Sequence, residues 1–134
     1  MLLTRHTCAC LLSLAARPGS YSSQAVATVA TVTRSGVTMG TIDPEALGFA
    51  KCTIEDLKGG DRVENAAILR KVLSGEMTGP VTDTVIFNAG AGLYVAGVAP
   101  SVEAGCKMAA EAVKAGKPME VLSKWVASSN KDDA

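Results

Sequence analysis

Residues 58–97 read KGGDRVENAAILRKVLSGEMTGPVTDTVIFNAGAGLYVAG, and this stretch decides the fold. The Asp61-Arg62-Val63-Glu64 sequence has the spacing of a capping box, in which the first and last residues satisfy free amide groups at a helix start. Apolar residues then recur at helical spacing, and Gly75 is placed to end the helix. The predicted inner face comprises Val63, Ala66, Ala67, Ile68, Leu69, Val72 and Leu73. The Thr78-Gly79-Pro80 sequence predicts a turn.

The second half of the stretch, residues 84–96, is apolar on nearly every side. Asn88 is the one amide side chain within it that can form hydrogen bonds. A helix of that kind must be buried. Asp83 is predicted to cap it. A strand is the competing local interpretation for residues 84–87, because Thr-Val-Ile-Phe has strong β propensity.

Two further helices are expected after this stretch. Ser101 caps the third, which Gly116 ends, and Pro118 begins the fourth. The residues predicted to face inward are Ala104, Met108, Ala109, Ala112 and Val113 on the third helix, and Leu122, Trp125 and Val126 on the fourth. Together these segments predict a mainly helical protein.

Short elements are expected before the stretch. Residues 35–42 are rich in β-branched side chains and predict a short strand. Asp43-Pro44-Glu45 begins a segment of about one helical turn that Gly48 limits, and residues 53–57 form another such turn with Thr53 as its cap. The expected fold class is therefore predominantly α with one or two short β-strands.

Length and charge restrict the function further. A chain of 134 residues has room for one domain, and with 48% hydrophobic but only 4% aromatic residues its core would be aliphatic. All 13 acidic residues lie at or after Asp43, so residues 1–42 carry a net charge of +3 and the rest −3. Neither half has the clustered basic face that nucleic-acid binding needs. No run approaches the roughly 20 apolar residues of a transmembrane helix.

The first 34 residues contain no acid and are rich in Ser, Thr, Ala and Arg, which is typical of an organelle transit peptide. Two alternatives are a secretory signal, because residues 8–16 are apolar after Arg5, and a stretch with no targeting role. The predicted division is thus a disordered leader over 1–34, a folded region over 35–129 and a polar tail over 130–134.

Candidate chemical motifs each have a simpler structural explanation. Gly90-Ala91-Gly92 after an apolar run suggests dinucleotide binding, but Val95 stands where a third glycine is needed, which favours close helix packing. Gly59-Gly60-Asp61 could hold a phosphate on backbone amides, yet Asp61 places a negative charge there, which favours a turn and a cap.

The remaining candidates are acidic pairs, cysteines and the single histidine. Glu55-Asp56 and Asp132-Asp133 are the adjacent acid pairs, and solvated charges explain them better than a metal clamp. Cys8, Cys10, Cys52 and Cys106 have neither zinc-site nor disulfide-framework spacing, and Cys106 is expected to be a small buried helix residue. His6 lies in the leader, so no imidazole base is expected beside a nucleophile. The sequence therefore assigns no catalytic, substrate-binding or metal residue.

Several motifs in order resemble the C-terminal part of the anthranilate phosphoribosyltransferases, of glycosyltransferase family 3, over about residues 37–129. They are Asp43-Pro44-Glu45-Ala46-Leu47-Gly48, Asp56-Leu57-Lys58-Gly59-Gly60-Asp61, Glu64-Asn65-Ala66-Ala67-Ile68-Leu69, Val72-Leu73-Ser74-Gly75, Asn88-Ala89, Leu93 to Gly97, Gly105 and Ala115-Gly116. The sequence of residues 52–61 is most similar to that of the plant enzymes, so the resemblance implies a plastid location.

The resemblance implies a small helical domain joined to an α/β domain, and phosphoribosyl transfer from phosphoribosyl diphosphate to anthranilate in tryptophan synthesis. The family's Gly-Thr-Gly-Gly-Asp phosphate loop, its His-Gly segment and its magnesium-binding Asp-Glu pair precede the matched region and are not in this sequence. The expectation is a chain inactive by itself, with no bound cofactor and with another protein or a second copy as a partner. The alternatives are a non-catalytic interaction module that packs on the full-length enzyme, and a related phosphoribosyltransferase or nucleoside phosphorylase with a different base.

Overall fold

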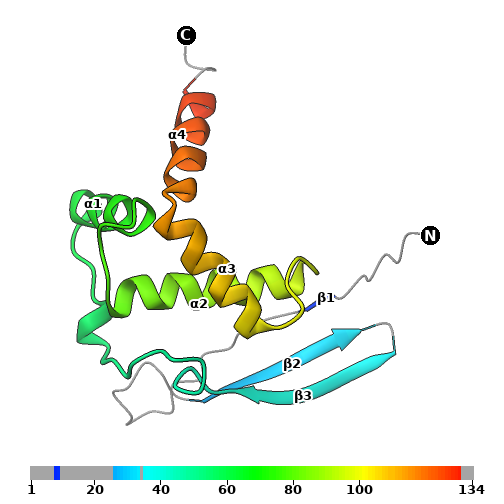
Figure 1. Cartoon of the computed structure of the whole chain (residues 1–134). Helices are drawn as coiled ribbons and strands as arrows, with labels where there is room; N and C mark the ends of the chain where they lie inside the picture. Colours follow the sequence, from blue (N-terminus) through cyan, green and yellow to red (C-terminus); the bar gives the residue numbers. More distant parts are fainter. Residues whose placement is uncertain (1–7, 10–25, 34, 131–134) are drawn as a thin grey trace.

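The computed structural model describes residues 8–9, 26–33 and 35–130. Its strands are β1 (Cys8–Ala9), β2 (Ala27–Thr33) and β3 (Gly36–Ile42), followed by a short 3-10 helix, η1 (Glu55–Leu57). Four α-helices come next: α1 (Arg62–Leu73), α2 (Pro80–Val95), α3 (Val102–Lys114) and α4 (Lys117–Ser129). In Figure 1 the β2–β3 hairpin lies along one side of α2, α3 crosses α2, and α4 points away from the sheet. The predicted class, mainly helical with a small sheet, is confirmed.

The sheet is an antiparallel hairpin with a short third strand. β2 pairs with β3 in a register that runs from Ala27 opposite Ile42 to Thr33 opposite Gly36, and β1 adds to the outer side of β2. β3 confirms the strand predicted over residues 35–42. β2, in contrast, lies inside the segment assigned to a disordered leader, and for residues 27–33 that assignment is wrong. Alternating Ala, Thr and Val are typical both of transit peptides and of strands, and pairing with β3 favours the strand.

The connection between the sheet and α1 follows the predicted short turns. The Asp43 carboxylate accepts a hydrogen bond from the Glu45 amide at 3.0 Å, and residues 44–48 form a turn that ends at Gly48 with a φ of 89°. Only glycine adopts that backbone conformation without strain. η1 then leads into the loop before α1.

α1 begins at the predicted capping box and carries Val72, which is 1% exposed. Within α1 Val72 is the one buried residue, and Val63 is 67% exposed. The prediction of a broad buried face on this helix is therefore wrong for this chain. A helical pattern specifies an apolar face, but it does not specify that the same chain covers it.

α2 confirms the helical interpretation of residues 84–96 and rejects the strand alternative for residues 84–87. It begins earlier than predicted, at Pro80, with Gly79 in the N-cap position at a φ of 100°. Asp83 is therefore in the first turn and not at the cap, which corrects its predicted role. Pro80 at the first helical position lacks the amide hydrogen that would otherwise need a partner, so it favours this earlier start.

The centre of the helical core is the crossing of α2 and α3. Ser101 caps α3 as predicted, accepting a hydrogen bond from the Ala104 amide at 3.1 Å. Of the predicted inner face of α3, Ala109 and Val113 are buried and Met108 is exposed. Among the described residues, the buried apolar side chains are Cys52, Val72, Phe87, Ala99, Cys106, Ala109 and Val113. Phe87 meets Phe49 edge-to-face, with ring centroids 5.9 Å apart.

α4 follows α3 after Gly116, which has a left-handed φ of 68°. Leu122 is half-buried, but Trp125 is 68% exposed and Val126 is also exposed. The inward position predicted for Trp125 and Val126 is therefore wrong. No residue of α4 is buried, because this helix leaves the core formed by α2 and α3.

Candidate functional site

The Gly59-Gly60-Asp61 segment leads into a helix cap in which the Gly60 and Asp61 amides already have partners. The Gly60 amide donates to Asn65 Oδ1 at 3.0 Å, and the Asp61 amide donates to Glu64 Oε2 at 3.1 Å. Asp61 Oδ1 accepts from the amides of Val63 and Glu64 at 2.8 and 2.9 Å. A carboxylate thus occupies the positive end of α1, where a phosphate would have to bind. The cap interpretation is confirmed.

Asn65 is a part of this cap that sequence reasoning missed. Its Nδ2 donates to the Gly60 carbonyl oxygen at 2.9 Å while its Oδ1 accepts from the Gly60 amide, so one side chain satisfies both backbone groups. The spacing of five residues is not a standard capping signal. The side chain therefore fixes the Gly-Gly loop in a way that only the folded geometry reveals.

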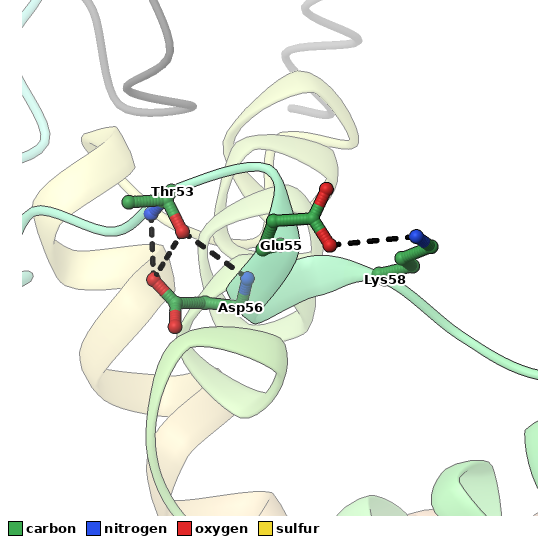
Figure 2. Close-up of polar contacts among 4 residues, drawn as sticks. All are labelled: Thr53, Glu55, Asp56 and Lys58. Carbon is green, nitrogen blue, oxygen red and sulfur yellow. Dashed lines mark hydrogen bonds and ion pairs between the residues drawn. The ribbon is translucent and has the colours of Figure 1, made fainter.

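Glu55 and Asp56 turn their carboxylates toward different partners, as Figure 2 shows. Asp56 Oδ2 accepts hydrogen bonds from the Thr53 amide at 2.7 Å and from Thr53 Oγ1 at 2.8 Å. Glu55 Oε2 lies 3.4 Å from Lys58 Nζ. The hydrogen bond from the Thr53 backbone, followed by the one from its hydroxyl, lowers the pKa of Asp56. The pair therefore stabilises η1 and does not converge on a metal.

The residues present do not fit the magnesium that the family resemblance implies. Within residues 8–9, 26–33 and 35–130, no group of three or more His, Cys, Asp or Glu side chains could hold a metal ion. Asp132 and Asp133 lie outside the described residues, and so does His6. This part of the chain therefore offers no cluster of magnesium ligands.

The cysteines do not form a reactive centre in the part of the chain that the structure describes. Cys52 and Cys106 are buried, and burial raises the pKa of the Cys106 thiol above its ordinary value. A thiol that is kept protonated is a poor nucleophile. Cys8 lies in β1, and Cys10 is outside the described residues.

Gly90 and Gly92 lie in the interior of α2 and not in a strand-to-helix turn, so the dinucleotide-binding interpretation is wrong. Gly90 is buried against α3, where an added Cβ would lie 2.5 Å from the Cys106 amide nitrogen. This confirms close helix packing at Gly90. Gly92, on another side of the helix, is exposed, and an added Cβ there would meet nothing within 4 Å.

A further candidate site is a groove of about 490 Å³ between the β2–β3 hairpin and helices α2 and α3, which we call the α2 groove. Its lining consists of apolar, small and neutral polar residues: Val29, Ala30, Thr31, Gly40, Thr41, Ile42, Asn88, Ala91, Gly92, Tyr94, Val95, Pro100, Ser101 and Val102. Sequence reasoning missed this groove because β2, which forms one wall, was not predicted.

The chemistry available in the α2 groove is limited. None of its lining residues is Asp, Glu, Lys, Arg or His. Asn88 Nδ2 donates to the Thr84 carbonyl oxygen at 2.8 Å, and Ser101 Oγ caps α3, so both side chains already have structural roles. The groove can bury an apolar surface, but it offers no carboxylate or imidazole for proton transfer.

None of the described helices combines the length and hydropathy needed to cross a membrane.

Comparison with known proteins gives a consistent result. Residues 19–119 match the family described as "Glycosyl transferase family, a/b domain". Anthranilate phosphoribosyltransferase from Chlamydia felis is 48% identical over 88 residues, which are 66% of this chain and 25% of that protein. The enzyme of the same name from Pelobacter propionicus is 45% identical over 98 residues, 73% of this chain and 28% of that protein.

A solved structure agrees with these sequence matches. The crystal structure of anthranilate phosphoribosyltransferase from Thermus thermophilus is similar with a TM-score of 0.70 and 38% identity, over 78% of this chain and 31% of that chain. The chain thus spans between a quarter and a third of the length of these relatives. The match from residue 19 includes the β2–β3 hairpin, and this extends the resemblance seen in the sequence toward the N-terminus.

Proposed function

Since the chain belongs to the glycosyl transferase family whose α/β domain its residues 19–119 match, we propose that it serves phosphoribosyl transfer from phosphoribosyl diphosphate to anthranilate. The observation that carries this proposal is the 48% identity to an anthranilate phosphoribosyltransferase over 88 residues. Identity at this level over two thirds of the chain favours a role in the same reaction more than a shared fold alone.

We propose that this chain contributes scaffold to the reaction and not its reacting groups. Transfer from a diphosphate ester needs stabilisation of the departing diphosphate and of positive charge at the sugar carbon. The α2 groove has no charged lining residue, and the acids near α1 are engaged in caps. On this proposal the phosphate loop and the magnesium ligands belong to sequence that the relatives have in addition to the matched region, and the isolated chain is inactive.

A chimera tests the proposal. In the Thermus thermophilus enzyme, the region that superposes on this chain would be replaced by residues 26–130, and an enzyme with that region deleted would serve as the control. We expect magnesium-dependent consumption of anthranilate by the chimera at a rate above that of the deletion control. A chimera that folds, as judged by circular dichroism, but has no more activity than the control would contradict the proposal.

A second candidate function is a non-catalytic module that packs on a full-length transferase. Exposed apolar residues on α4 favour it, since Trp125 and Val121 are 68% and 65% exposed. Exposed aromatic and aliphatic residues on one helix commonly mark protein contacts. Sedimentation of the chain with the full-length Thermus thermophilus enzyme tests this candidate: co-sedimentation that Trp125→Ser abolishes would support it, and independent sedimentation would reject it.

We also propose a plastid location for the protein, on the acid-free, hydroxyl-rich composition of its N-terminal segment. Because β2 begins at Ala27, a targeting segment would have to end before that strand for the hairpin to be kept. Fusion of residues 1–25 to a fluorescent protein and incubation with isolated chloroplasts tests this. Import with cleavage is expected, whereas translocation into microsomes instead would favour a secretory signal.

A further inference from the structure

Glycine stands on both walls of the α2 groove. Gly40 lies within β3 and Gly92 within α2, and both residues line the groove. A Cβ added at either position would meet no atom of the described residues within 4 Å. Neither glycine has the positive φ of a turn, and neither is packed against another element as Gly90 is. The space in front of each of these two glycines is therefore open.

The two glycines weaken their elements without a packing reason. Inside a helix or a strand, glycine is less stable than alanine because its backbone loses more conformational freedom on folding. At Gly90 the close approach of α3 explains the glycine, since an added Cβ would collide with Cys106. No such contact with described residues explains Gly40 or Gly92. Glycine in a strand interior is typical of a site that a ligand approaches closely. The pair therefore indicates a groove that is kept open for an occupant.

The lining of the groove favours an uncharged occupant. None of the described residues that line it is Asp, Glu, Lys, Arg or His. A bound anion needs a cation or several hydrogen-bond donors, so the carboxylate of anthranilate and the phosphates of phosphoribosyl diphosphate are both poorly matched to this groove. The inference therefore goes beyond the proposed function and does not depend on it.

The shape of the groove narrows the class of ligand further. In Figure 1 the β2–β3 hairpin lies along α2, and the groove between them has a sheet for one wall and a helix for the other. Its volume of about 490 Å³ is in the range of small-molecule sites. A flat ring system fits between two such walls, and Tyr94 adds an aromatic side chain to the lining.

Asn88 supplies the groove with a polar group that has unused hydrogen-bonding capacity. Its Nδ2 donates to the Thr84 carbonyl oxygen at 2.8 Å, and within the described residues its Oδ1 accepts no hydrogen bond. A side-chain amide oxygen can accept two. Asn88 can therefore orient a ligand that carries an N–H or O–H group.

We propose that the α2 groove binds a neutral, fused-ring aromatic molecule that carries an amide or hydroxyl group. The rings lie between Gly40 and Gly92, where neither wall has a side chain, and the polar group of the ligand donates a hydrogen bond to Asn88 Oδ1. Because the lining supplies no carboxylate or imidazole, the ligand is bound and not chemically changed.

Equilibrium dialysis of the 134-residue chain with two matched probes tests the proposal. The probes 2-naphthamide and 2-naphthoate have the same ring system, and only the naphthoate carries a charge. Gly92→Leu and Gly40→Leu each fill the groove from one wall. The matched controls are Ala89→Leu on α2 and Met39→Leu on β3, which replace exposed residues that do not line the groove. Circular dichroism checks that each variant folds.

We expect saturable binding of 2-naphthamide, one molecule per chain, to the wild type and to both controls. Gly92→Leu and Gly40→Leu should each bind it at least about tenfold more weakly, because the added side chain occupies the space of the rings. The wild type should bind 2-naphthoate at least about tenfold more weakly than the amide, because the carboxylate finds no cation in the groove.

Absence of saturable 2-naphthamide binding to the wild type would overturn the proposal. Equal binding of the two probes, or unchanged binding by either glycine variant that folds, would also overturn it. A dimer of the wild-type chain that Gly92→Leu dissociates, as measured by sedimentation velocity, would overturn it as well, because a second copy would then occupy the groove. Phosphoribosyl transfer is not a readout of these measurements, so the proposed function can fail without changing their outcome.

Discussion

Gly90 of α2 and Gly105 of α3 lie against each other at the helix crossing, where a Cβ added to Gly105 would come 2.9 Å from the Gly90 carbonyl carbon. Two glycines facing each other allow the backbones to approach more closely than side chains would permit. The buried residues Cys106 and Ala109 extend the same contact along α3. The position of α3 over α2 therefore depends on the absence of side chains at these two residues.

Alanine at Gly90 and at Gly92 should have opposite effects on stability. Gly90→Ala places a methyl group against Cys106 and should destabilise the fold by about 1–3 kcal/mol through overpacking. Gly92→Ala meets no atom within 4 Å and should stabilise α2 by up to about 1 kcal/mol. Urea denaturation followed by circular dichroism measures both. Equal changes at the two positions would contradict the packing described here.

Removing the α1 cap should weaken this helix. Asp61→Ala leaves the amides of Val63 and Glu64 without their acceptor, and we expect a loss of about 1 kcal/mol in the free energy of unfolding. Glu111→Ala is the control, because Glu111 is an exposed residue in the interior of α3, and its effect should stay within about 0.5 kcal/mol. If both variants unfold at the same urea concentration, the cap does not stabilise the fold.

The hydrogen bonds between Thr53 and Asp56 predict a pH-dependent contribution to stability. Because they lower the pKa of Asp56 in the folded state, the carboxylate stabilises η1 above its unfolded pKa, and this contribution is lost as the pH falls through the folded pKa. Asp56→Asn should therefore be less stable than wild type at pH 7, and the difference should shrink toward pH 3.

Thr53→Ala serves as the control for this prediction. It removes the hydroxyl donor but keeps the backbone amide, which is the larger cause of the pKa shift. Its pH dependence should lie between those of wild type and Asp56→Asn. A stability difference between wild type and Asp56→Asn that is the same at pH 7 and pH 3 would show that Asp56 acts through packing and not through its charge.

The thiol of Cys106 should react slowly in the native protein. It is 6% exposed at the α2–α3 crossing, and burial raises its pKa. Treatment with iodoacetamide at pH 8, followed by mass spectrometry of the peptide that contains Cys106, should show little modification before unfolding and rapid modification in urea. Equal rates in the two states would mean that the helix crossing opens readily.

Local signals in the sequence predicted much of this fold. The Asp61-to-Glu64 capping box and the Ser101 cap were predicted because each lies within four residues of the amides it satisfies. The start of α2 was missed by a few residues, since Asp83 and Pro80 both resemble helix starts and only the turn at Gly79 distinguishes them.

Features that depend on distant contacts could not be predicted in this way. β2 was missed because its composition also fits a leader, and its identity as a strand depends on pairing with β3. Because β2 forms one wall of the α2 groove, the groove could not be predicted either. Likewise, the apolar pattern of α4 predicted an inner face, but whether Trp125 is covered depends on what packs against that helix. The sequence pattern separates apolar faces from polar ones and does not assign each face a partner.

Turnover by the isolated chain is the most direct measurement, because we propose that this chain contributes scaffold and not reacting groups. Purified 134-residue protein would be incubated with anthranilate, phosphoribosyl diphosphate and magnesium, with the Thermus thermophilus enzyme as positive control, and the loss of anthranilate fluorescence recorded. We expect no loss of fluorescence above the rate without protein. Magnesium-dependent turnover by the chain alone would contradict it, and would place reacting groups within these residues.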